Sequence, residues 1–251
     1  MLTVQTIAAI SIIIFIASTV RGFTGFGLAL VAVPMLQFFM PVTDTAVFIA
    51  IVNFIFSLIY FGRTRKVLKT QPLGLMALFT AIGVAAGTLI LKFVYPAYIQ
   101  LSWGILILVI VLFLVRGMSF NIKSERYALT LSGILGGVLA GLTGIIGPPV
   151  AIILSSIKTP KEKFNAIISV FILFAVTSVL FFYLLTGLIR KETVILGLFS
   201  VPALLAGLFM GDLLVKHVSQ KRFTNFVYTL LIIMGIITIL KGLSGSFPGL
   251  F

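Results

Sequence analysis

The sequence predicts an all-α polytopic membrane protein built from two transmembrane repeats of opposite topology. Its 251 residues are 61% hydrophobic and 9% charged, with a mean hydropathy of +1.29, whereas soluble domains carry about 25% charged residues. A Gly-rich apolar segment that ends in proline occurs twice, about half a chain apart. Lys and Arg gather in short segments between apolar runs. These three observations support a membrane bundle with internal symmetry.

The charge and cysteine content exclude several classes. A net charge of +13 would suggest nucleic acid in a soluble protein, but Lys and Arg collect in the cytoplasmic loops of membrane proteins, so we expect no nucleic-acid partner. The chain has no cysteine, which excludes disulfides and thiol chemistry. The segment 1–6 lacks basic residues, so a cleaved signal peptide is not expected.

Runs without charged residues mark the expected spans. They cover 1–20, 22–43, 45–62, 70–91, 93–115, 127–157, 164–189, 193–211 and 223–240. The run 127–157 would be about 46 Å long as one straight helix, although about 20 residues cross the membrane core. Because Pro148 and Pro149 remove backbone donors and disfavour helix before them, we expect a break over 144–149. Segment 1–43 should break near 21–27, giving eight to ten membrane segments in all.

The duplication extends beyond the two breaks. GFTGFGLALVAVP at 22–34 corresponds to GLTGIIGPPVAIIL at 141–154, and the segment 78–87 aligns with 198–207 at an offset of about 120 residues. Each repeat is therefore a Gly-broken helical hairpin followed by three transmembrane helices. We expect a first repeat over 1–117, a cytoplasmic linker at 118–126, a second repeat over 127–242 and a short C-terminal tail at 243–251.

Five segments per repeat is an odd number, which predicts opposite orientations for the two repeats. If the loop 63–69 is cytoplasmic, so are 116–126, 158–163 and 216–222, and these four loops hold thirteen Lys and Arg residues against four on the other side. This asymmetry favours inverted repeats with both termini outside the cytoplasm. It assumes that each Gly-rich hairpin returns to its starting side.

The two breaks are the expected binding site. Broken helices in lipid must be buried in protein or line a wet cavity, and a half-helix N-terminus favours an anion. Arg21 is the single charge in the first 43 residues and can bind oxyanions bidentately. The candidate substrate-binding residues are Arg21, Gly22, Thr24, Gly25, Gly27, Asn53, Gly141, Thr143, Gly144, Gly147, Pro148 and Pro149.

Each candidate also has a structural explanation. The glycines could serve close helix packing, Arg21 could be one more charge that sets topology, the threonines could bond to their own backbone, and Asn53 could join helices. No carboxylate lies within a predicted span, which leaves no candidate for a buried proton relay or sodium site. The chain also lacks HExxH and Gly-x-Ser-x-Gly motifs, so we expect neither an enzyme nor a cofactor.

The two Gly-rich segments resemble those of the sulfite exporter TauE/SafE family of membrane permeases, and the two-half arrangement extends that resemblance over nearly the whole chain. Leu28 and Pro148 stand where the family often has glycine. The resemblance implies a multi-pass protein of the cell membrane that moves sulfite, an organosulfonate or a related small anion.

We therefore expect a secondary transporter that binds a small oxyanion between the two breaks and works by alternating access. An anion channel on the same symmetric site and a structural subunit of a membrane complex are the alternatives. Saturable counterflow distinguishes a transporter from a channel, and absence of flux from purified protein indicates a structural subunit.

Overall fold

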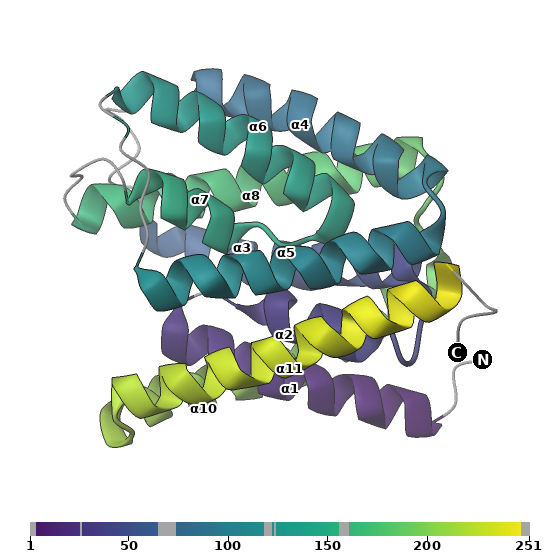
Figure 1. Cartoon of the computed structure of the whole chain (residues 1–251). Coiled ribbons are helices and arrows are strands. Elements are labelled where there is room, and N and C mark those ends of the chain that lie inside the picture. Colours follow the sequence, from purple (N-terminus) through teal and green to yellow (C-terminus); the bar gives the residue numbers. More distant parts are fainter. Residues whose placement is uncertain are drawn as a thin grey trace.

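The computed structural model describes residues 4–25, 27–64, 74–117, 122, 124–155 and 161–246. These residues form eleven α-helices and no strand, which confirms the predicted all-α fold (Figure 1). The first half contains α1 (Val4–Thr24), α2 (Leu28–Leu36), α3 (Val42–Thr64), α4 (Gly74–Phe93) and α5 (Pro96–Arg116). The second half contains α6 (Glu125–Thr143), α7 (Gly147–Leu154), α8 (Lys161–Leu185), α9 (Lys191–Phe199), α10 (Val201–His217) and α11 (Gln220–Ser246).

Seven of these helices are long and apolar enough to cross a membrane, namely α1, α3, α4, α5, α6, α8 and α11. The pair α9 and α10, which meet at a 40° bend, raises the number to eight if they form one span. The expected eight to ten membrane segments included both arms of each hairpin, and α2 and α7 are the short arms. The nine residues of α2 and the eight of α7 reach only about 12–14 Å, too short for a core of about 30 Å.

The helix ends differ from the predicted repeat boundaries. Helix α6 begins at Glu125, inside the segment expected to be a linker, and α11 continues to Ser246, into the segment expected to be a tail. Ser124 explains the first difference, since its side chain accepts a hydrogen bond from the Tyr127 N–H and caps α6. Of the loop cations used to predict topology, Arg65, Lys66, Lys69, Lys123 and Lys158 lie outside the described residues.

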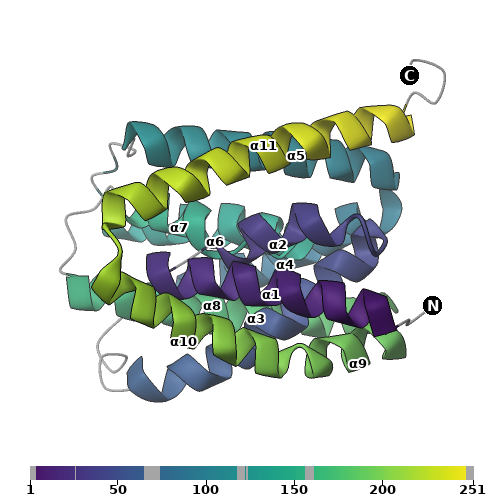
Figure 2. The same ribbon diagram turned by 90° about the horizontal axis from the view of Figure 1, so that it is seen from below.

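The two halves pack on each other reciprocally. Helix α1 of the first half packs against α10 of the second, and α6 of the second half packs against α4 of the first. Two further pairs join equivalent helices, α3 with α8 and α5 with α11. Helices α5 and α11 lie side by side and run in opposite directions (Figures 1 and 2). This pairing is what an inverted repeat would produce, and the repeat relation remains a prediction.

Glycines bring the backbones of the two halves together along both reciprocal seams. A Cβ added at Gly207 would lie 2.4 Å from the Phe15 carbonyl oxygen on α1, and one at Gly87 would lie 2.2 Å from the Val138 carbonyl oxygen on α6. Small residues of this kind are typical of tight helix contacts in membranes, where packing rather than burial from water drives association. The seams therefore join the first helix of each hairpin, α1 or α6, to a helix of the opposite half.

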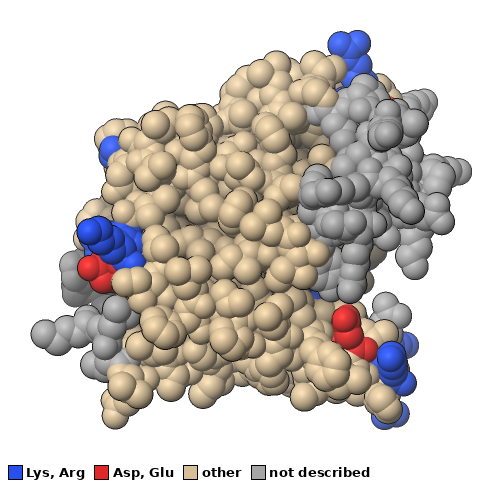
Figure 3. Space-filling view, turned by 180° about the vertical axis from the view of Figure 1, so that it is seen from behind, with Lys and Arg blue, Asp and Glu red and all other residues tan. Residues whose placement is uncertain are grey.

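The surface fits a lipid environment. Large apolar side chains are exposed on the outer helices, including Leu78, Phe181, Phe209 and Phe226. The face seen in Figure 3 carries its charged side chains near the edges and is uncharged in between. Among the described residues, the ion pair between Arg190 and Asp44 joins the start of α9 to the start of α3 with a separation of 3.3 Å.

Two exposed tyrosines test the predicted orientation. Tyr95 and Tyr127 have nearly equal exposures of 62% and 61% and precede or begin α5 and α6, on opposite sides of the membrane in the predicted topology. In this Cys-free chain, an impermeant maleimide applied to whole cells should label Tyr95→Cys and should label Tyr127→Cys only after permeabilisation. Equal labelling of both variants from outside would contradict the topology.

Candidate functional site

The first break lies between Thr24 and Leu28, in the last part of the predicted segment 21–27. Helix α1 continues through Arg21 to Thr24, and the Gly25 N–H donates to the Arg21 carbonyl at 2.7 Å. Gly25 and Gly27 have φ angles of 82° and 105°, a backbone region that side chains disfavour. Arg21 is therefore in the last turn of α1 and not in the break. In that turn its positive charge interacts favourably with the negative end of the helix dipole.

The second break is equally short and lies just before the prolines. Helix α6 ends at Thr143, Gly144 has a φ of 71°, and α7 begins at Gly147 with Pro148 and Pro149 in its first turn. Because N–H groups in a first turn have no partner within the helix, proline costs little there. The prolines thus start α7 and do not themselves form the break.

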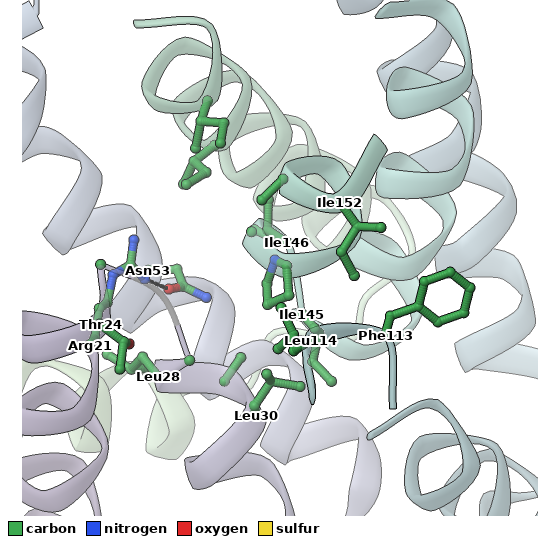
Figure 4. A pocket seen from close by; sticks show the side chains of 18 of the residues that line it. Arg21, Thr24, Leu28, Leu30, Asn53, Phe113, Leu114, Ile145, Ile146 and Ile152 are labelled. Carbon is green, nitrogen blue, oxygen red and sulfur yellow. Dashed lines mark hydrogen bonds between the residues drawn. The ribbon is translucent and has the colours of Figure 1, made fainter. Parts of the chain in front are cut away.

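A cavity of about 450 Å³ lies between the two breaks. Side chains from α1, α2, α3, α5, α7 and α8 surround it together with both glycine turns. Eight of the twelve predicted residues line this cavity: Arg21, Thr24, Gly25, Gly27, Asn53, Gly144, Gly147 and Pro148. In Figure 4, Arg21 and Asn53 point toward one another on one side, and Ile145, Leu114 and Ile152 lie on the other.

The other four predicted residues do not line the cavity. Gly22 and Gly141 belong to the seams, because a Cβ at either would meet a backbone oxygen, of Leu208 at 2.7 Å and of Val84 at 2.4 Å. The Thr143 hydroxyl donates to the Leu139 carbonyl at 2.7 Å and accepts from the Ile145 N–H at 2.9 Å, so it shapes the turn. Pro149 lies in the first turn of α7.

Arg21 is a buried cation at the wall of the cavity, with 7% of its surface exposed. Its Nη1 donates to the Asn53 Oδ1 at 2.6 Å, and its Cζ lies 3.5 Å from the centroid of the Phe56 ring. Both contacts come from α3, and together they hold the planar guanidinium by a charge-assisted hydrogen bond and a cation–π interaction.

Asn53 joins the two breaks. It is 2% exposed, and while its Oδ1 accepts from Arg21 its Nδ2 donates to the Gly144 carbonyl at 3.2 Å. The two hydrogen bonds of Asn53 on α3 therefore connect the end of α1 to the end of α6. Asn53 therefore positions the cation against the second break. It both lines the cavity and joins helices, the two roles that the sequence left open.

The rest of the cavity is apolar and carries no negative charge among the residues that the structure describes there. Helices α5 and α8 contribute Phe113, Leu114, Phe164, Ile168 and Ile172. Sequence reasoning missed this lining because apolar residues in a membrane span give no sign of which side faces a cavity. It also missed Tyr183 on α8, whose buried hydroxyl donates to the Gly141 carbonyl at 2.7 Å and satisfies the end of α6.

The arrangement defines a polytopic membrane protein of the transporter type, with two broken helical hairpins facing a central cavity. A family model described as sulfite exporter TauE/SafE matches residues 10–238, and the chain therefore belongs to this family of membrane transporters. No curated protein and no solved structure matches the chain.

Replacing Asn53 by leucine tests the bridge. Asn53→Leu removes the acceptor of a buried guanidinium, and the free energy of unfolding should fall by about 1.5–3 kcal/mol, the usual worth of a hydrogen bond to a charged group. Thermal unfolding of the purified protein in detergent measures the loss. Asn225→Leu, at an exposed position near the start of α11, is the matched control and should leave stability unchanged.

A double-mutant cycle separates the bridge from general packing. Once Arg21→Met has removed the charge, Asn53→Leu should cost clearly less than it does in the wild type. Strictly additive losses would contradict the proposed coupling between the two residues.

Proposed function

We propose that the protein is a secondary transporter of a small oxyanion, sulfite or an organosulfonate, that binds between the two Gly-rich breaks. The observation that carries this proposal is the guanidinium of Arg21, a buried cation facing an apolar cavity whose described lining has no carboxylate. A fixed positive charge in such surroundings favours an anion and disfavours cations. The family assignment supports the same substrate class.

Helix α2 supplies a second source of positive potential. Its first residues, Leu28, Ala29 and Leu30, line the cavity, and the first N–H groups of a helix have no intrahelical acceptor. An oxyanion between this helix start and Arg21 would accept hydrogen bonds from both. Helix α7 contributes less, since Pro148 and Pro149 have no N–H.

Alternating access would arise from the two halves. One seam packs α1 of the first half against the second half, and the other packs α6 of the second half against the first. Movement of one half relative to the other would change which end of the cavity is open. The transporter would act in the cell membrane with both termini outside the cytoplasm. A channel would use the same site but would have both ends of the cavity open at once.

Flux from liposomes containing the purified protein tests the proposal. A panel of sulfite, sulfoacetate, sulfate, thiosulfate and simple carboxylates should reveal saturable uptake of at least one sulfur oxyanion, stimulated by the same anion inside. Non-saturating conductance would instead support a channel, and absence of flux for every anion would support a structural subunit.

Two substitutions at Arg21 test its role. Arg21→Gln should weaken anion binding by about tenfold or more, since a charge-assisted hydrogen bond is worth roughly 1.5–3 kcal/mol. Arg21→Lys keeps the charge but loses the bidentate geometry, so its affinity should fall between those of the wild type and Arg21→Gln. Affinity is measured on correctly inserted protein, and unchanged affinity in Arg21→Gln would remove Arg21 from the site.

Two glycine substitutions test the turns. Gly25→Val and Gly144→Val place a β-branched side chain at φ angles of 82° and 71°, and a left-handed residue costs about 1–2 kcal/mol even before crowding. Both variants should insert but lose transport. Gly74→Val is the control, because a Cβ at Gly74 meets nothing within 4 Å. Normal flux in both test variants would show that transport does not depend on glycine at these two turns.

A further inference from the structure

A second cavity lies outside the central site, where α2 ends and α11 nears its end. Its volume is about 430 Å³, and it shares no lining residue with the central cavity. The wall is formed by the segment that joins α2 to α3, by the first turns of α5 and by α11. The lining residues are Gln37, Phe38, Phe39, Met40, Pro41, Val42, Thr43, Pro96, Gln100 and Lys241.

Gln37 is a buried side chain in this wall that has no hydrogen-bond partner. It is 5% exposed, and neither its Nε2 nor its Oε1 makes a hydrogen bond. A buried amide of this kind is costly, because it has given up water without gaining a partner. A ligand that accepts a hydrogen bond from the Nε2 would recover part of that cost.

Lys241 brings a positive charge to the same wall. Its Nζ donates to the backbone carbonyl of Gln37, which caps the end of α2, and lies 4.6 Å from the centroid of the Phe38 ring. A cation at a helix C-terminus is favourable. An ammonium group has three donors, and no carboxylate is present among the described residues that line the cavity. The charge of Lys241 is therefore not neutralised there.

We propose that this cavity binds a tetrahedral oxyanion, a sulfonate, sulfate or phosphate group, between the Gln37 amide and the Lys241 ammonium. One anion oxygen accepts from the Gln37 Nε2, and another accepts from the Lys241 Nζ. The same chemistry is found in a soluble anion and in the phosphate of a lipid headgroup. Phe38 and Phe39, which line the cavity, are 57% and 47% exposed, so the cavity is open to the surface of the molecule.

This proposal does not rest on the proposed transport function, because the two cavities have separate residues. Gln37→Leu tests it without loss of fold, since replacing an amide that has no partner by an apolar group of similar size should leave the unliganded protein at least as stable. Anion binding at this site should weaken by about tenfold or more in Gln37→Leu. Arg21→Gln, which affects the central cavity alone, is the control and should leave anion binding at the second cavity unchanged.

The experiment uses the full chain in a maltoside detergent and in nanodiscs of phosphatidylglycerol. In detergent, a titration with methanesulfonate that saturates in Arg21→Gln and weakens in Arg21→Gln with Gln37→Leu supports a soluble-anion site. In nanodiscs, native mass spectrometry that finds a phosphatidylglycerol molecule retained by the wild type and lost in Gln37→Leu supports a headgroup site. If Gln37→Leu changes neither methanesulfonate affinity nor lipid retention, the proposal is overturned.

Discussion

The buried guanidinium of Arg21 is the constraint on which the rest of the site depends. Placing a charge in an apolar interior costs several kcal/mol, so the bundle must supply groups that replace water around it. Asn53 and Phe56 on α3 do so at 2.6 Å and 3.5 Å. The Asn53 amide then reaches the Gly144 carbonyl. One charge on α1 therefore fixes how α3 and the second break are placed.

The glycine seams make this arrangement possible. A broken helix exposes backbone N–H and C=O groups, which lipid cannot satisfy, so both breaks must lie inside protein. The close contacts of α1 with α10 and of α6 with α4 bring each hairpin against the opposite half. The Tyr183 hydroxyl then satisfies the Gly141 carbonyl at the end of α6. The packing of the two halves on each other and the burial of both breaks thus depend on the same helix contacts.

The sequence predicted the helical fold, both breaks and eight of the residues that line the cavity, because glycine, proline and a lone cation in an apolar run have strong local meaning. It could not separate Gly25, which needs a positive φ, from Gly22, which meets the backbone of α10. That distinction depends on a neighbour about 190 residues away in the chain. The bridge through Asn53 and the apolar lining from α5 and α8 depend on such neighbours too, and no local pattern reveals them.

We propose that the cavity between the breaks selects its ligand by charge, through Arg21. Comparing methanesulfonate with dimethyl sulfone tests this most directly, because the two molecules have similar size and shape but the sulfone is neutral. Each is titrated against the purified protein that carries Gln37→Leu, so that binding at the second cavity is weakened. We expect saturable binding of methanesulfonate and at least about tenfold weaker binding of the sulfone. Equal affinity for the two molecules would contradict it.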